Sequence, residues 1–187
     1  MPQKNDNLKK ITKIFMPWNF EKEQAWLEEK AREGWKLVKH DYHYTFEKNE
    51  PENVVIRSDY ISLATEKKKK EYIALFEESG WEFVGATTGW YYFRIPADQY
   101  DTDIYSDPQS KIEQLKRLNQ DALGFYFLYF ILFAIVLDYE TWFDLIFFIP
   151  MLAGLIWGVV YILKIRDKIK TLYKEMGEEE EPLEIQL

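Results

Sequence analysis

The chain has 187 residues, of which 47% are apolar and 18% aromatic, enough for one folded domain with a packed core. It contains no cysteine, which excludes disulfides, thiol nucleophiles and zinc–thiolate sites. The formal net charge of −8 disfavours nucleic acid as the main partner, because a nucleic-acid-binding surface needs an excess of basic side chains.

Residues 1–10 form a polar N-terminal arm without an apolar stretch, so we expect no cleavable signal peptide. The following sequence, to residue 95, resembles itself at an offset of 46 residues. Gly34-Trp35 matches Gly80-Trp81, and similar residues recur on both sides of these pairs. Two copies are too few for a solenoid, so the pattern predicts a duplicated supersecondary unit that closes into one cytoplasmic domain, residues 11–95.

Each copy is predicted to contain a strand, a helix and two further strands. The predicted strands are residues 11–18, 35–40 and 43–48 in the first copy and 54–63, 81–86 and 90–94 in the second; the helices are residues 21–33 and 65–79. Gly34 and Gly80 would end the helices in the left-handed conformation that suits glycine, and Thr65 would cap the start of the second helix. The predicted fold class is α+β: a duplicated β-α-β-β unit, with a ferredoxin-like antiparallel sheet and two helices on one face, followed by a two-helix transmembrane hairpin.

Large apolar side chains alternate along the predicted strands so that both sheet faces are rich in them. Trp35 and Trp81 lie on one side of their strands, and Tyr44, Trp90 and Tyr92 alternate with other apolar or aromatic residues. An antiparallel sheet with one solvated face is polar on that face. We therefore expect a partner copy, a ligand or the chain's own tail to cover the second face. The alternative is that twist and curvature bury these aromatic residues in an ordinary core.

Residues 96–107 are predicted to be a polar linker, and residues 108–176 a membrane hairpin with helical extensions. Two apolar runs, residues 122–137 and 145–163, contain no charged residue and no histidine. At 1.5 Å per residue they give about 24 and 28 Å of helix, against a hydrocarbon core of about 30 Å. We predict spans at about residues 119–138 and 144–163. The alternative is a pair of buried core helices in a soluble protein.

Lysine and arginine flank the predicted hairpin on both sides and are absent from its acidic turn. The positive-inside rule therefore places both termini in the cytoplasm, with the protein in the inner (cytoplasmic) membrane. Gly154 and Gly158 form a small-xxx-small pattern that lets another helix approach closely. Its partner would be the first span, a second copy in a homodimer, or another membrane protein. Residues 177–187 are a predicted acidic tail.

Several short motifs occur between residues 10 and 117. They are Phe20-Glu-Lys-Glu, Gly34-Trp-Lys-Leu-Val, Tyr44-Thr-Phe-Glu-Lys, Arg57-Ser-Asp-Tyr, Phe76-Glu-Glu-Ser-Gly-Trp-Glu-Phe-Val, Trp90-Tyr-Tyr-Phe-Arg and Ile104-Tyr-Ser-Asp. Together they resemble the bacterial domain-of-unknown-function family 2812. The resemblance implies a regulatory or envelope-related accessory role, because members are often followed by membrane helices and often encoded beside PadR-type transcriptional repressors. It implies no catalytic residues.

The candidate binding residues lie on the predicted strands or at their ends. They are Trp35, Tyr44, Arg57, Asp59, Trp81, Trp90, Tyr92 and Arg94. Arg57 and Asp59 could face Arg94 across a pocket, or they could form a structural ion pair on the sheet. His40 and His43 flank a turn and could hold a metal, but solvated turn residues are the simpler interpretation, so we predict no metal and no cofactor.

No catalytic triad, phosphate-binding glycine loop or carboxylate pair is evident, so we expect no enzyme. We expect a membrane-anchored cytoplasmic binding or signalling module, linked to transcriptional or envelope-stress regulation. Its aromatic sheet face would bind a small apolar ligand or a protein partner. One alternative is an accessory subunit of a membrane transporter or exporter, whose function lies in the spans. Another is a small ligand-modifying enzyme built around Arg57, Asp59 and Arg94.

Overall fold

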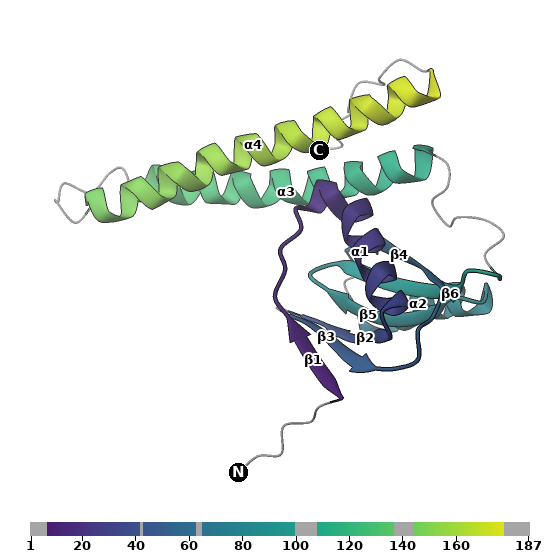
Figure 1. The fold of residues 1–187 in the computed structure, drawn as a ribbon. Coiled ribbons are helices and arrows are strands. Elements are labelled where there is room, and N and C mark those ends of the chain that lie inside the picture. The colour runs from purple at the N-terminus through teal and green to yellow at the C-terminus, as the bar shows by residue number, and fades with distance from the viewer. Residues whose placement is uncertain (1–6, 42, 63–64, 100–107, 137–143, 178–187) are drawn as a thin grey trace, which may run out of the picture. The chain divides into compact units, whose positions relative to one another are not determined.

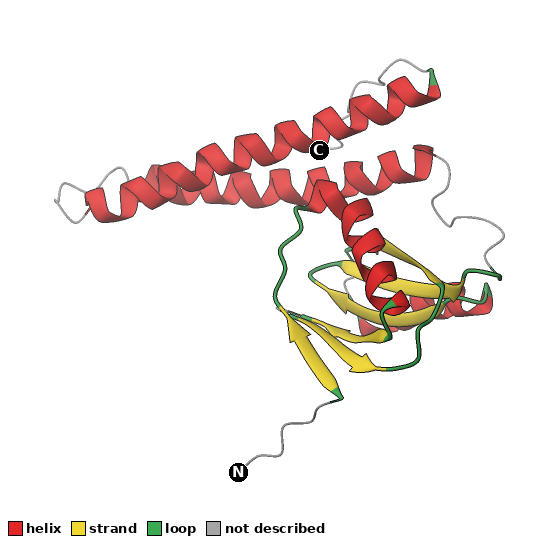
Figure 2. Cartoon of the chain, in the orientation of Figure 1, coloured by secondary structure: helices red, strands yellow, loops and turns green. Residues whose placement is uncertain are grey.

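The computed structural model describes residues 7–41, 43–62, 65–99, 108–136 and 144–177. They belong to two units, Met1–Ile104 and Tyr105–Leu187, which are considered separately below. The first unit is α+β and the second is helical (Figures 1 and 2). Most of the predicted N-terminal arm and linker, the acidic turn between the apolar runs and nearly all of the acidic tail lie outside the described residues.

The elements of the first unit follow the predicted order closely. They are β1 (Leu8–Ile11), a 3-10 turn η1 (Pro17–Asn19), α1 (Phe20–Arg32), β2 (Trp35–His40), β3 (Tyr44–Lys48), β4 (Val54–Tyr60), α2 (Glu66–Glu78), β5 (Glu82–Thr87) and β6 (Trp90–Pro96). The first predicted strand, residues 11–18, was wrong. The strand ends at Ile11, which pairs with Tyr44 at the beginning of β3, so no partner strand continues past it.

The predicted helix ends are confirmed by their backbone geometry. Gly34 and Gly80 follow α1 and α2 with φ of +82° and +88°, in the left-handed region. At Gly34 a Cβ atom would also lie 2.8 Å from the Asn49 carbonyl oxygen, so the chain passes too close for any side chain. Thr65 caps α2, because its hydroxyl accepts a hydrogen bond from the Lys68 backbone N–H at 3.3 Å.

The strands form two three-stranded antiparallel sheets, with orders β1-β3-β2 and β4-β6-β5, and the expectation of one sheet was wrong. Strands β2 and β5 are neighbours, since Lys36 Nζ lies 3.2 Å from Glu82 Oε1. Each of these two strands has a register shift, between Leu37 and Lys39 in β2 and between Phe83 and Gly85 in β5. A bulge disrupts the regular spacing of backbone donors and acceptors, which explains why no ladder joins the two sheets.

Helices α1 and α2 lie on opposite faces of the β4-β6-β5 sheet, so the expectation that both cover one face was wrong (Figures 1 and 2). The side chains of β6 alternate between them. The Tyr92 hydroxyl donates to Glu23 of α1 at 2.9 Å, whereas the Phe93 ring stacks 4.1 Å from Phe76 of α2. Both aromatic faces of this sheet are therefore covered by the chain's own helices. This agrees with the alternative that the aromatic residues form an ordinary core.

The second unit consists of α3 (Pro108–Val136) and α4 (Asp144–Met176), which pack against each other. The Tyr129 hydroxyl of α3 donates to the Met151 carbonyl of α4 at 3.2 Å. Both helices are long and apolar enough to cross a membrane. Only 17% and 11% of their most apolar windows are buried, whereas a core helix of a soluble protein is mostly buried.

Candidate functional site

The aromatic candidates from the sequence do not form an open face. Tyr44, Trp81, Trp90 and Tyr92 are all buried, with exposed fractions of 9% or less. Trp81 belongs to the core beneath α2, and Trp90 packs against Phe20, with ring centroids 6.0 Å apart. Trp35 is half-buried, and the Lys9 ammonium lies 5.0 Å from its ring centroid. These residues contribute mainly to packing within the first unit.

Each of the charged candidates contacts side chains from other elements of the first unit. Arg57 Nη1 lies 3.0 Å from Glu28 Oε1, and Asp59, which is buried, accepts a hydrogen bond from the Tyr72 hydroxyl. Arg94 contacts two carboxylates that the sequence did not single out. Its Nη1 lies 2.9 Å from Glu52 Oε2 and its Nη2 lies 2.6 Å from Glu82 Oε2.

Strand register explains why Arg94 does not converge with the other two charged candidates. In the β4–β6 pair, Arg94 lies opposite Ile56, whereas Arg57 lies opposite Phe93 and Asp59 lies opposite Tyr91. Directly opposed residues share a sheet face, and neighbours along a strand alternate. The register thus places Arg94 on one face and both Arg57 and Asp59 on the other.

A buried polar cluster lies beneath α1, and sequence reasoning missed its centre, Glu23. One oxygen of Glu23 accepts hydrogen bonds from the hydroxyls of Tyr44, at 2.6 Å, and Tyr92, at 2.9 Å. The His40 ring stacks on Tyr44 at a centroid distance of 4.0 Å, and its Nδ1 lies 3.9 Å from Glu23. We call Glu23, His40, Tyr44 and Tyr92 the Glu23 cluster. It ties α1 to both sheets, because Tyr44 comes from β3 and Tyr92 from β6.

Burial dominates the protonation behaviour of the Glu23 cluster. It raises the pKa of Glu23, although the two tyrosine hydrogen bonds act in the opposite direction. It lowers the pKa of His40 to about 4, so this imidazole is neutral at pH 7 and its contact with Glu23 is not an ion pair there. Burial, followed by the nearby Glu23 charge, raises the pKa of both Tyr44 and Tyr92. Both phenols are therefore neutral donors at physiological pH.

The two histidines have different surroundings. His40 packs inside the Glu23 cluster, whereas exposed His43 has its Nδ1 2.8 Å from the Thr12 hydroxyl. Within the described part of the chain, no three His, Cys, Asp or Glu side chains lie close enough together to hold a metal ion.

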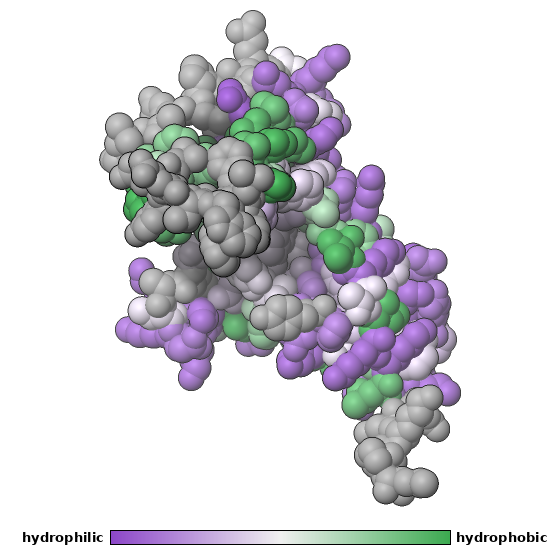
Figure 3. Space-filling model, turned by 90° about the vertical axis from the view of Figure 1, so that its left-hand side faces the viewer, coloured by the Kyte–Doolittle hydropathy of each residue, from purple (hydrophilic) through white to green (hydrophobic). Residues whose placement is uncertain are grey.

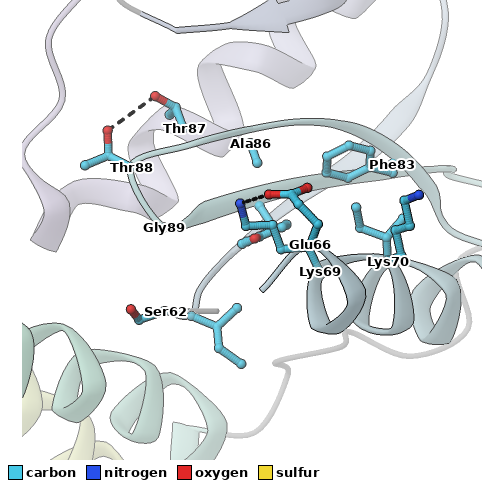
Figure 4. A pocket seen from close by; sticks show the side chains of 12 residues that line it. Ser62, Glu66, Lys69, Lys70, Phe83, Ala86, Thr87, Thr88 and Gly89 are labelled. Carbon is cyan, nitrogen blue, oxygen red and sulfur yellow. Dashed lines mark hydrogen bonds and ion pairs between the residues drawn. The ribbon is translucent and has the colours of Figure 1, made fainter. Parts of the chain in front are cut away.

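A cavity of about 590 Å³ lies between the first turns of α2, the end of β4 and the turn that joins β5 to β6 (Figure 4). Its apolar lining includes Ile73, Phe83 and Tyr91, and its polar lining includes Lys69 and Lys70. The sequence signal for its charge is the run of four lysines at residues 67–70. The cavity itself was missed because its lining comes from separate segments.

The turn that borders this cavity has an unusual backbone conformation. Thr88 has φ of +49° and Gly89 has φ of +85°. A glycine is required at position 89, because a Cβ atom there would lie 2.8 Å from the Tyr60 ring. A β-branched residue with positive φ, such as Thr88, is rare and costs local strain. The turn places the hydroxyls of Thr87 and Thr88 3.5 Å apart, on the side of the turn that faces away from α2 (Figure 4).

A second cavity, of about 390 Å³, contains Arg94. Its guanidinium already contacts Glu52 and Glu82, so it offers little free positive charge.

Comparison with known proteins identifies one family. The model of a family described as protein of unknown function (DUF2812) matches residues 19–128, more than half of the chain. The match begins just before α1 and ends within α3. No curated protein and no solved structure gives a significant match.

Proposed function

Because the chain belongs to the DUF2812 family, whose description assigns no activity, we propose a function from its geometry: a membrane-anchored, non-enzymatic binding module with a regulatory accessory role. In this proposal α3 and α4 cross the inner membrane as a two-pass hairpin. Both termini are cytoplasmic, and the α+β unit binds its partner or ligand there, in a role linked to transcriptional or envelope-stress regulation. The observation that carries the proposal is the exposed apolar surface of α3 and α4.

This apolar surface is large and lies on residues 123–135 of α3 and residues 149–163 of α4. Phe125, Phe127 and Ile149 are 64%, 69% and 62% exposed, and a further group of large apolar side chains is exposed as well. The group comprises Leu123, Leu128, Phe130, Ile131, Leu132, Ile135, Leu152, Ile156, Trp157, Val159, Val160 and Leu163. Figure 3 shows green hydrophobic surface beside the grey atoms near the hairpin end. Soluble proteins rarely expose such a surface, whereas lipid solvates it.

The remaining parts of the two helices have the polar surface that is expected of helices in water. At 29 and 33 residues, α3 and α4 are about 43 and 50 Å long, which exceeds a hydrocarbon core of about 30 Å. In residues 108–121 and 164–176 the exposed positions are mainly polar or charged, whereas Ile112, Leu115 and Ile165 are fully buried. This pattern supports a two-helix stalk that continues out of the membrane on the side rich in lysine and arginine.

Internal duplication of the first unit belongs to the same proposal. Each half has the order strand, helix, strand, strand, and the last strand of each half is the centre of its sheet. The register shifts after Leu37 and Phe83 are separated by the same number of residues as Gly34 and Gly80, the glycines that end the two helices. The halves differ in packing, since α1 contacts residues of both sheets. We infer one ancestral β-α-β-β unit whose second copy became a platform for the first helix.

The alternative functions have less support. In a transporter accessory subunit the glycine pattern would bind another protein, but Gly154 faces Tyr129 and Gly158 faces Tyr126 of the same chain. A ligand-modifying enzyme would need Arg57, Asp59 and Arg94 to converge, and the register of β4 and β6 places Arg94 on the opposite sheet face from the other two. Anchoring of a binding module therefore remains the function that the geometry favours.

Alkaline carbonate extraction of cell membranes tests the anchor. The full chain is expected to stay in the membrane pellet. The double variant Phe127→Lys/Leu152→Lys is expected to leave the membrane fraction, because each charge near the bilayer centre costs about 3 kcal/mol and both side chains are exposed there. Leu75→Lys is the matched control, because Leu75 is 61% exposed on α2 of the first unit and should tolerate the charge. Release of the unmodified chain by carbonate would refute the proposal.

A further inference from the structure

We propose that the cavity between α2 and the β5–β6 turn binds a small amphipathic anion: an apolar body that carries a carboxylate or phosphate group. This ligand class rests on the proposed function, because it specifies what the binding module binds. The binding site itself needs no membrane, since the described residues that line it all lie in the first unit.

The apolar half of the cavity supplies a surface for the body of the ligand. Phe83 and Ile73 are partly buried, Tyr91 is almost completely buried, and all three line the cavity. A volume of about 590 Å³ is within the range of roughly 300–1,000 Å³ that is typical of small-molecule sites. Burial of an aromatic or short aliphatic group against these residues would provide the hydrophobic part of the binding free energy.

The charged half of the cavity supplies the counter-charge. Lys69 and Lys70 both line it, and Glu66 is the only acidic residue among the described residues of its lining. Glu66 forms an ion pair with Lys69, which lowers the pKa of Glu66 and raises that of Lys69, so both are charged at pH 7. Lys70 makes no ion pair within the described residues and lies beside Phe83 (Figure 4). The cavity therefore has a net positive charge, with one ammonium group available next to its apolar wall.

The position of the cavity along α2 also favours an anion. The cavity lies at the first turns of this helix, where the helix dipole is positive. Thr87 and Thr88 border the cavity, but their hydroxyls lie on the side of the β5–β6 turn that faces away from Lys69 and Lys70 (Figure 4), so the lysines alone supply its charged half.

Isothermal titration of the full chain in phosphatidylcholine nanodiscs, with empty nanodiscs subtracted, tests the proposal. The probes are 2-naphthoate and 2-naphthyl phosphate, with neutral 2-naphthylmethanol as the comparison. We expect saturable binding of at least one anion below 1 mM, and binding of the alcohol at least tenfold weaker, because the alcohol carries no negative charge to pair with the Lys70 ammonium.

Matched variants distinguish binding in the cavity from non-specific electrostatic attraction to the lysines of α2. Lys69→Gln/Lys70→Gln should weaken anion binding at least tenfold. Lys67→Gln/Lys68→Gln removes the same charge from the same helix outside the lining, and should change binding less than twofold. Glu66→Gln should strengthen binding several-fold, since it removes a repulsive carboxylate and releases Lys69. Ala86→Trp, at an exposed position in the lining, should block the site without removing any charge.

Three results would overturn the proposal. They are the absence of anion binding up to 1 mM, binding of the alcohol as tight as that of the anions, and an equal loss of anion affinity in the two double-lysine variants. Each would leave the carbonate extraction of the unmodified chain unchanged, so failure of this site is distinguishable from failure of the membrane anchor.

Discussion

Replacement of Gly154 and Gly158 by leucine is expected to disrupt the packing of α3 against α4. At Gly154 a Cβ atom would lie 2.9 Å from Tyr129 Cζ and closer still to the Tyr129 hydroxyl oxygen. At Gly158 a Cβ atom would lie 2.9 Å from Tyr126 Cζ and closer still to two other atoms of that ring. Real Cβ atoms are essentially never found at such distances, so the rings or the helices must move. Overpacking costs about 1–3 kcal/mol per site, so the double variant should lose about 2–6 kcal/mol.

Thermal unfolding in detergent measures this loss, and the chain supplies its own control. Gly124 lies on α3, and a Cβ atom there would have no neighbour within 4 Å. Gly124→Leu should therefore unfold within about 2 °C of the unmodified protein, whereas the double variant should unfold at least 10 °C lower. Equal unfolding temperatures for the double variant and Gly124→Leu would show that the two glycines do not form the contact between the helices.

Replacement of Glu23 by alanine is expected to lower the free energy of unfolding of the first unit by about 3 kcal/mol. The carboxylate is the shared acceptor of two buried tyrosine hydroxyls, and without it both hydroxyls lose their partner. The contact of α1 with both sheets would weaken at the same time. Denaturant unfolding monitored by tryptophan fluorescence measures the change. Glu29→Ala, at an exposed position on the same helix, should change the free energy by less than 0.5 kcal/mol.

Two further variants assign the cost of Glu23→Ala to hydrogen bonding. Glu23→Gln keeps an acceptor oxygen and should retain most of the stability. The triple variant Glu23→Leu/Tyr44→Phe/Tyr92→Phe removes the acceptor together with both donors, so no hydroxyl is left unsatisfied and much of the loss should be recovered. If the triple variant is as unstable as Glu23→Ala, the contribution of Glu23 comes from packing, and our interpretation of the cluster is wrong.

Local elements of this fold could be predicted from sequence because their signals are local. Gly34 and Gly80 mark the helix ends through a backbone conformation that other residues avoid, and Thr65 marks a helix start. The first strand was misplaced because its end depends on where its partner β3 begins, 33 residues later. The division into two sheets depends on the register shifts in β2 and β5, which have no distinctive sequence signal.

The candidate sites were harder to predict for a related reason. Alternating aromatic residues showed that both sheet faces must be covered, but alternation does not say which helix covers which face. The structure places α1 on one face and α2 on the other, and buries Tyr44 and Tyr92 around Glu23. A glutamate on a helix gives no sign in the sequence that it will be buried. The partners of Arg57 and Arg94 likewise come from elements distant in the chain.

Cysteine accessibility in intact cells tests the central claim, that α3 and α4 cross the membrane and hold the α+β unit in the cytoplasm. The chain has no cysteine, so single substitutions give an unambiguous signal with a membrane-impermeant maleimide. Thr141→Cys, between α3 and α4, is predicted to react from outside. Glu77→Cys, at an exposed position of α2, is predicted to react only after the cells are lysed. Labelling of Glu77→Cys in intact cells, or protection of Thr141→Cys until lysis, would contradict this topology.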